Sequence, residues 1–594
     1  MKNKETSLPA PPTSSNVSPL SVRALFVWHD VRGRGPFSVR AALCMALPAT
    51  IGWLLGYEIE GLIATLGGFA GLYGAQQAYH RRALILAWAV VGLTIAVALG
   101  SLGAVTTWFG VLTVALFAGV TVWICNSLNV GSPGAYMFVL ACTMGVMIHG
   151  KATPLWQTLL LVAGGGIIAW CVQMTGYLIY PNGPQRRIVI AAARAVRSLV
   201  HSLGTPGEEA ARYLAASSLQ TSLEMLKGTP LETPYQKLNR RINRLFAAVN
   251  RRDSASDALL ALSNALVEEA GRLPTRRVSV TARSVGDIQE VNRTVQGWRA
   301  SELIMDGFFR RYSEVRRCTI RVIIASALSG ALALTLGMNQ AFWAITTAVL
   351  VLHQSAGRKI LLQRGWLRLM GTLLGLLLAE ILILINPHGL WLVLTIGIMQ
   401  FIVEMLILRN YALAAAFVTP GSLLIAVNVI GSPDNLLFAR GVDTLLGVLV
   451  AYFVLFIVFA RSGERQLPEI LSETLDASEA SLNMLATGDV GSEELLRRQA
   501  RLRHRLIDLY DTYNNAIHES RETEKMVVPY WNNVVRTLRV GYQILVAGWS
   551  EGANLNLTHW CEQIKIERGR CKNMAVAMSS QGTQNNRKNV DASD

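Results

Sequence analysis

Charged residues are scarce in this sequence of 594 residues: only 16% are Asp, Glu, Lys or Arg, whereas 52% are hydrophobic. Positions 83–148 contain none of these four charged residue types. A soluble globular chain does not need so much apolar sequence for its cores, and this one stretch is long enough for about three spanning helices of roughly 20 residues each. The scarcity of charge therefore excludes a soluble protein and predicts an integral membrane protein.

Cysteine is also rare, and the signatures of common enzymes are missing. The seven cysteines show no regular pairing or metal-ligand spacing. The stretch GVMIHGKA at 145–152 resembles a phosphate-binding loop, but Ala152 replaces the Ser or Thr that would reach magnesium. We therefore expect no enzymatic activity, no cofactor and no metal, so that any active transport runs on an ion gradient.

Apolar segments and their basic flanks predict twelve membrane-spanning helices in two sets of six. Basic residues collect at every second junction, as in Arg81-Arg82 and Arg186-Arg187, with Lys151 as the exception. This pattern predicts that both termini are cytoplasmic. The predicted spans lie near 41–57, 60–79, 83–101, 104–126, 133–149, 155–180, 320–337, 341–357, 366–385, 389–408, 411–430 and 436–460.

The fold class that follows is an all-α membrane protein with two six-helix repeats, each followed by a helical cytoplasmic region. Amphipathic patterns such as RRIVIAAARAVRSLVHSL indicate helices in these polar regions. The predicted division is a disordered or basic segment at 1–40, a membrane repeat at 41–180, a cytoplasmic helical region at 181–318, a second membrane repeat at 319–460, a C-terminal helical region at 461–579 and a disordered tail at 580–594.

Two similar stripes stand out in the second set of spans. Arg, Gly or Asp, Thr and Gly recur at offsets 0, 3, 4 and 7 in RLMGTLLG and RGVDTLLG. These offsets place the four side chains on one face of a helix. The stripes consist of Arg368, Gly371, Thr372 and Gly375, and of Arg440, Asp443, Thr444 and Gly447.

The small residues and the arginines have different explanations. Gly371, Gly375 and Gly447 suit close helix packing, whereas Arg368 and Arg440 are candidates for binding a substrate. Thr372 and Thr444 are candidates for substrate binding too, and helix packing is the alternative for both. Arg368 has an alternative, because an arginine near a span end can extend to the lipid headgroups. Arg440 lies on the disfavoured side of the membrane for a basic residue, so it marks either a transport path or an ion pair with Asp443.

Carboxyl groups within the predicted spans are the candidates for proton coupling. These are Glu404, Glu380 and Asp443. Burial in lipid disfavours the charged form, so such a group can bind and release a proton. The alternative is that each is a paired or protonated packing residue.

The second repeat resembles the fusaric acid resistance family. That family's pattern is a Trp-containing helix, a short basic loop and then Arg-x-x-Gly-Thr-x-x-x-Gly. It falls here on Trp343, Arg358, Arg368, Gly371, Thr372 and Gly375. The resemblance implies efflux of aromatic and other carboxylic acids from bacteria, often beside a periplasmic adaptor protein, and a distant similarity to plant malate channels.

The sequence and the resemblance together predict an inner-membrane exporter of organic carboxylates, aromatic ones in particular, that is coupled to protons. A guanidinium pairs bidentately with a carboxylate, and Trp343 offers a surface on which an aromatic ring can stack. A passive anion channel, and a membrane scaffold or sensor with partner-binding cytoplasmic helices, remain as alternatives. The expected partners are membrane lipid, an organic anion, a periplasmic adaptor and a second copy of the chain, with no nucleic acid.

Overall fold

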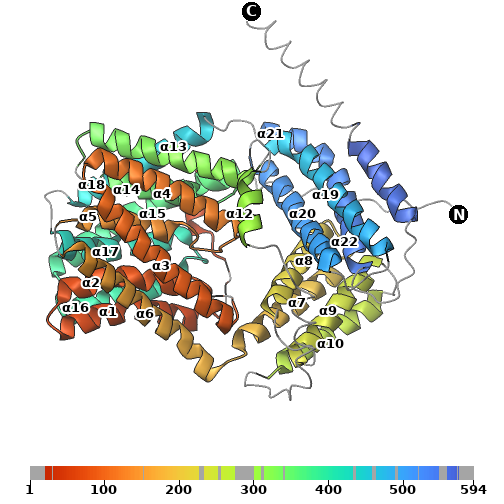
Figure 1. The fold of residues 1–594 in the computed structure, drawn as a ribbon, viewed down its shortest axis with the longest axis horizontal. Coiled ribbons are helices and arrows are strands. Elements are labelled where there is room, and N and C mark those ends of the chain that lie inside the picture. Colours follow the sequence, from red (N-terminus) through yellow and green to blue (C-terminus); the bar gives the residue numbers. More distant parts are fainter. Residues whose placement is uncertain are drawn as a thin grey trace, which may run out of the picture. The chain divides into compact units, whose positions relative to one another are not determined.

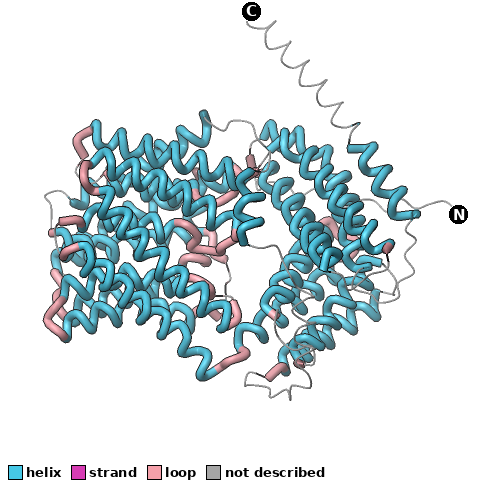
Figure 2. The backbone as a smooth tube through the Cα atoms, in the orientation of Figure 1, coloured by secondary structure: helices cyan, strands magenta, loops and turns pink. Residues whose placement is uncertain are grey.

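The computed structural model describes the protein as an assembly of helices (Figures 1 and 2). It describes residues 20–29, 31, 33–75, 77–150, 153–226, 233–251, 256–274, 300–309, 313–338, 341–431, 436–457, 463–487, 493–519, 521–547, 558–571 and 573. These residues form α-helices and short 3-10 helices and contain no strand. The prediction of an all-α membrane protein is therefore confirmed.

The chain folds into two compact units. The described residues of 15–179 and 300–460 form the first, which we call the membrane unit. Those of 180–299 and 461–594 form the second, which we call the polar unit because its helices carry many charged residues.

A helix occupies each of the twelve predicted spans. Eight of the described helices are long and apolar enough to cross a membrane by length and composition. The helices of the membrane unit are α1 (Gly35–Leu54), α2 (Glu58–Gly68), α3 (Tyr79–Gly103), α4 (Thr107–Ser127), α5 (Tyr136–Ile148), α6 (Leu155–Ile179), α12 (Ala300–Phe309), α13 (Glu314–Thr335), α14 (Phe342–Leu352), α15 (Arg358–Ile385), α16 (Leu390–Leu406), α17 (Tyr411–Ile430) and α18 (Leu436–Ile457).

The second helix of each predicted repeat is shorter than expected. α2 and α14 have 11 residues each, about half of what a span requires. α2 ends in Gly67-Gly68, which a 3-10 turn follows, and α14 ends at Leu352, before an irregular segment that begins with His353. Every residue of α14 is buried, so this helix belongs to the interior of the membrane unit and not to its lipid-facing surface.

The two halves of the membrane unit use equivalent helix pairs. The second helix packs on the sixth (α2 with α6, α14 with α18), and the third packs on the fifth (α3 with α5, α15 with α17). Each first helix packs on the fourth helix of the other half, α1 on α16 and α13 on α4. Small residues permit these contacts: a Cβ atom added to Gly447 in α18 would lie 2.5 Å from the carbonyl oxygen of Ala344 in α14.

The polar unit joins two regions that are far apart in the sequence. Its helices include α7 (Gly183–His201), α8 (Glu208–Met225), α9 (Pro234–Arg251), α10 (Ser256–Arg272), α19 (Gly463–Ala486), α20 (Glu493–Ile517), α21 (Arg521–Val527) and α22 (Trp531–Ala547). Their apolar faces form one shared hydrophobic core. The insert between the membrane halves and the C-terminal region therefore fold together.

A buried ion network connects these two regions. Arg212 in α8 contacts Glu208 and Glu209 of its own helix at 2.6 Å, and Arg539 in α22 contacts Glu209 at 2.7 Å. Burial alone raises the pKa of Glu208, but the backbone N–H of Gly204 and the Arg212 guanidinium outweigh it and hold that pKa below its ordinary value. The network therefore stabilises the polar unit when its carboxyl groups are ionised.

Candidate functional site

Arg440 lies deep within the membrane unit. It is the fifth residue of α18, it is only 2% exposed, and its guanidinium carbon lies 3.6 Å from the centroid of the Trp343 ring. α14 places Trp343 there because α14 packs directly on α18, and the ring is itself 2% exposed. A cation over an aromatic face is a favourable arrangement that gains strength when both groups are removed from water.

The hydrogen-bonding groups of Arg440 are largely unused. Within the described part of the chain, neither Nε nor Nη1 has a hydrogen-bond partner. The same holds for both carboxylate oxygens of Asp443, which is fully buried one turn further along α18. The spacing of these two residues allows an ion pair, but their side chains form no hydrogen bond with each other.

The stripe on α15 contributes two more buried polar groups. The Nε atom of Arg368 and the hydroxyl of Thr372 are buried and have no hydrogen-bond partner among the residues that the structure describes. α15 packs on α18, so the two helices that carry the stripes are neighbours. The Thr444 hydroxyl, by contrast, donates to the carbonyl oxygen of Arg440 at 2.9 Å.

The glycines of the stripes lie where two helix backbones approach closely. A Cβ atom on Gly375 would lie 2.7 Å from the carbonyl oxygen of Ala416 in α17. A Cβ atom on Gly371 would likewise lie too close to the carbonyl oxygen of Ala412, which is also in α17. These contacts fix α15 against α17 and so set the position of Arg368, which lies on the same stripe.

The two remaining carboxyl candidates lie apart from this arrangement. Glu380 is exposed on α15. Glu404 is buried in α16, where its Oε2 atom accepts a hydrogen bond of 2.8 Å from Arg34 and its Oε1 atom accepts one of 3.3 Å from Gln400. Of the three carboxyl candidates, only Asp443 therefore shares a helix face with Arg440.

Two buried arginines, Arg321 and Arg82, and the half-buried Arg40 were missed because basic residues at span ends were interpreted as topology signals. Arg321 in α13 donates from Nε and Nη2 to the carbonyl oxygen of Leu352, at 3.1 and 2.9 Å, where α14 ends. In the first half, Arg82 and Arg40 both donate to the Oε1 atom of Gln173. The Arg321 contacts satisfy a carbonyl group at the C-terminal end of α14, whereas Arg82 and Arg40 satisfy a side chain within α6. The position of each arginine before or at the start of a span gave no sign of these contacts.

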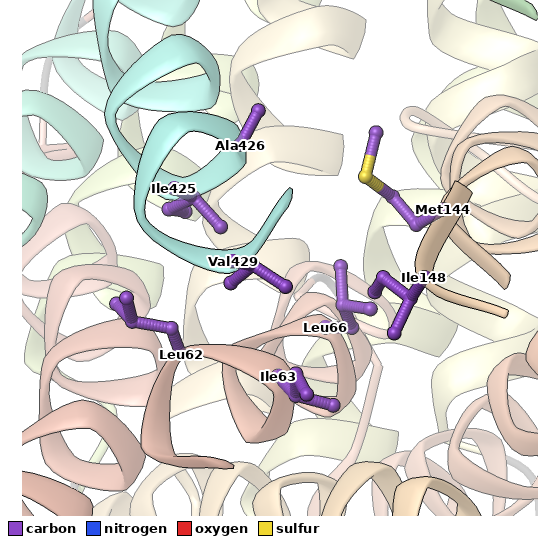
Figure 3. Close-up of a pocket in the computed structure, with 8 residues that line it drawn as sticks. All are labelled: Leu62, Ile63, Leu66, Met144, Ile148, Ile425, Ala426 and Val429. Atoms are coloured by element: carbon purple, nitrogen blue, oxygen red, sulfur yellow. The ribbon is translucent and has the colours of Figure 1, made fainter. Parts of the chain in front are cut away.

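An apolar cavity lies elsewhere in the membrane unit, between the two halves (Figure 3). Its lining contains no charged side chain, and none of its residues belongs to either stripe. The cavity therefore offers an anion no hydrogen-bond donor from a side chain. Its lining consists of Leu62, Ile63 and Leu66 from α2, Met144 and Ile148 from α5, and Ile425, Ala426 and Val429 from α17.

Chemically, the arrangement around Arg440 suits an anion. Two guanidinium groups and one carboxyl group share a buried region, so the fixed charge is positive when all three are ionised. Unused N–H groups in a buried region are costly to leave unpaired, and a carboxylate ligand has the geometry to satisfy them. Among the described residues, no group of three or more His, Cys, Asp or Glu side chains has an arrangement that would hold a metal ion.

Comparison with known proteins confirms the resemblance seen in the second half. Residues 326–454 match the family described as fusaric acid resistance protein-like. This range contains α14, both stripes and therefore the whole cluster around Arg440. The chain is also similar to the uncharacterized membrane protein YvaC of Bacillus subtilis (strain 168), with 24% identity over 565 residues, 88% of this chain and 86% of that protein. No solved structure matches.

Proposed function

We propose that this protein is a transporter that exports organic anions, with aromatic carboxylates as the preferred class. The observation that carries the proposal is the buried Arg440 guanidinium, which is stacked on Trp343 and has unused hydrogen-bond donors. A charged group buried in a membrane protein is costly, and such groups commonly mark a substrate or ion pathway. The match to the fusaric acid resistance protein-like family supports a role in efflux.

The geometry suggests how a carboxylate binds. One face of the Arg440 guanidinium is occupied by Trp343, so a carboxylate approaches in the plane of the guanidinium, where its two oxygens accept two parallel hydrogen bonds. Trp343 then orients the arginine, and an aromatic ring of the substrate stacks on the opposite face of the guanidinium. Arg368 supplies the second positive charge, and the Thr372 hydroxyl supplies a further donor.

Asp443 is the residue that we propose for proton coupling. Its carboxylate is buried without a hydrogen-bond partner within the described residues, and an unpaired buried charge is costly. A bound proton removes this cost, and an ionised Asp443 competes with the substrate for Arg440. Glu404 is less suitable because Arg34 pairs with it, and Glu380 is less suitable because it is exposed.

We further propose that the two halves of the membrane unit are copies of one repeat and that only the second half carries the anion site. Gly165 approaches Ala64 in the first half as Gly447 approaches Ala344 in the second. The residue seven positions before Gly447 is Arg440, whereas the residue seven positions before Gly165 is Thr158. The first half therefore supplies a similar framework without the guanidinium.

The distribution of basic residues supports placement in the inner membrane of a bacterium, with both termini in the cytoplasm. The segment before α1 and the first turns of α7 and α15 carry arginines, as the positive-inside rule requires for cytoplasmic ends. In this orientation the polar unit is cytoplasmic, and export moves the anion away from it.

The test is uptake of a radiolabelled aromatic acid, benzoate, into inverted membrane vesicles with and without an imposed pH gradient. We expect accumulation that depends on the gradient in the wild type and loss of it in Arg440→Gln at matched expression. Asp443→Asn should bind benzoate but no longer concentrate it against its gradient, because the proton-carrying group is gone.

Two results would contradict the proposal. If benzoate equilibrates at the same rate with and without a pH gradient, and Asp443→Asn has no effect, the protein is a passive anion channel. If the wild-type vesicles take up no more benzoate than vesicles without the protein, a scaffold or sensor role is favoured, and the cytoplasmic helices become the part to study.

A further inference from the structure

A short segment before the first membrane helix is held firmly against the second half of the membrane unit. We call residues 20–29, 31, 33 and 34 the N-terminal strap. The strap contains a 3-10 helix, η1 (Val22–Phe26), and leads directly into α1. It contacts the turn that joins α16 to α17, about 380 positions later in the chain.

Several hydrogen bonds fix the strap to this turn. The backbone N–H of His29 donates to the carbonyl oxygen of Arg409 at 3.0 Å, and the Arg409 guanidinium donates to the carbonyl oxygen of Val31 at 3.0 Å. The side-chain amide of Asn410 donates to the carbonyl oxygen of Leu25 at 2.7 Å. Apart from Arg34, whose guanidinium pairs with Glu404, the strap is attached mainly through its backbone, so most of its other side chains face outward.

The outward side chains are mostly apolar. Phe26 is 79% exposed and Trp28 is 55% exposed, and Val22 and Leu20 are also exposed. Within the strap, Ala24 is the one residue of η1 that is buried. An apolar and aromatic surface held in place by hydrogen bonds indicates a partner, because exposed apolar patches of this kind mark interaction sites.

The position of the strap indicates what that partner is. α16 exposes apolar side chains along its length, including Leu394 and Ile398, and Leu408 on the turn that holds the strap is exposed as well. This apolar surface faces lipid, so the end of α16 lies at the boundary between hydrocarbon and headgroups. Tryptophan is enriched at this depth, and an amphipathic segment lies there with its apolar side chains in the lipid.

Charge on the strap agrees with an anionic lipid surface. Arg23 is exposed on η1, and a basic residue near the membrane surface is attracted to anionic headgroups. We propose that the N-terminal strap is an interfacial anchor that inserts Phe26 and Trp28 into the headgroup region of an anionic leaflet. This inference does not depend on the proposed transport function.

The second half of the membrane unit carries an equivalent feature. The helix α12 precedes the first helix of that half and packs on α4. The indole N–H of Trp123 in α4 donates to the carbonyl oxygen of Ile304 in α12 at 3.0 Å, while Met305 and Phe309 remain exposed. Each half is thus preceded by a segment that docks on the other half and exposes apolar side chains.

The experiment uses the full chain in lipid nanodiscs with a fluorescent probe at position 26. The exposed and half-buried cysteines, Cys171 and Cys561, are replaced by serine, and Phe26→Cys is labelled with nitrobenzoxadiazole. Matched variants carry the probe at Trp391→Cys, an exposed position on the apolar helix α16, and at Leu214→Cys, an exposed apolar position in the polar unit. Quenching is measured with spin-labelled lipid and with aqueous iodide.

We expect the probe at position 26 to behave like the probe at position 391: strongly quenched by the spin-labelled lipid and protected from iodide. Addition of anionic phosphatidylglycerol to neutral discs should increase this protection, and Arg23→Ser should remove the increase. If the probe at position 26 is quenched by iodide as strongly as the probe at position 214, the strap faces water and the proposal is wrong. Protection from both quenchers would mean that protein covers the strap, which also overturns it.

Discussion

Replacing Arg440 with lysine separates the charge of the guanidinium from its shape. Lysine keeps one positive charge at the same position of α18, but it has no planar fork and cannot lie flat on the Trp343 ring. If the site only requires a positive charge, this change should be nearly neutral. If the site binds a carboxylate as we propose, the change should weaken binding of carboxylates more than binding of spherical anions.

The contacts of Arg440 set the size of the expected effect. A hydrogen bond that involves a charged group contributes about 1.5–3 kcal/mol, and lysine loses one of the two parallel bonds to a carboxylate. The stacked arrangement at 3.6 Å from the ring centroid contributes about 2 kcal/mol when it is desolvated, of which an ammonium keeps part. A total loss of about 2–3 kcal/mol corresponds to about 30- to 150-fold weaker carboxylate binding, at about 1.4 kcal/mol for each factor of ten.

The assay compares two anions in proteoliposomes that contain wild-type protein or Arg440→Lys. Labelled benzoate reports the carboxylate, and iodide reports a spherical anion that cannot use a fork. We expect benzoate affinity to fall by the factor above while iodide flux changes far less. Arg321→Lys is the matched control, because Arg321 is also buried in the second half but donates to the backbone of α14.

An equal loss of benzoate and iodide flux in Arg440→Lys would refute the bidentate arrangement, since it would show that the position acts only through charge or through folding. A loss of selectivity in Arg321→Lys of the same size would refute it as well. In that case, the effect would belong to buried arginines in general and not to the stacked one.

Three further predictions concern packing and the polar unit. Gly447→Leu should place side-chain atoms against the backbone of Ala344, and its unfolding temperature in detergent should fall as expected for overpacking of about 1–3 kcal/mol. Arg539→Ala should leave Glu209 with one partner fewer, and a loss of about 1–3 kcal/mol, below the 3–5 kcal/mol of a fully broken buried pair, should appear as faster hydrogen exchange in α8 and α22. The pKa of Glu208 lies below its ordinary value of 4.5, so the ionised carboxylate stabilises the fold above pH 4.5. This contribution is lost as the pH falls through the lower folded-state pKa. The free energy of unfolding should therefore decrease more steeply below pH 4.5 in the wild type than in Glu208→Gln.

Local patterns in the sequence were sufficient to predict the helices of the membrane unit and the two stripes. Apolar runs and basic flanks located a helix in every predicted span, because a membrane helix must satisfy its backbone internally and is therefore visible as one continuous apolar segment. Helix ends were less predictable. α2 and α14 are short because glycine-rich or polar segments follow them. The prediction from apolar pattern alone had included these segments in longer spans.

Contacts between distant parts of the chain could not be predicted in this way. Nothing in the local sequence around Glu404 indicates that its partner is Arg34, 370 positions earlier. The packing of the insert between the membrane halves against the C-terminal region is likewise not visible in the local sequence, because the two amphipathic surfaces match only in three dimensions. The sequence spacing predicted that Asp443 can reach Arg440. It could not predict that the two side chains form no hydrogen bond with each other, because their orientations depend on how α14 and α15 pack around them.

The contrast between the two halves agrees with the proposal of a single anion site in the second half. Equivalent helix pairs hold both halves together, so the framework does not require charge at the position of Arg440. In the first half Thr158 stands there, and its hydroxyl is satisfied locally by Thr153 at 2.6 Å. A buried guanidinium adds a desolvation cost that packing does not repay, and stacking on Trp343 offsets only part of it. Under the proposed function, an anion in the site recovers the remaining cost, so we expect substrate to bind in the half that carries Arg440.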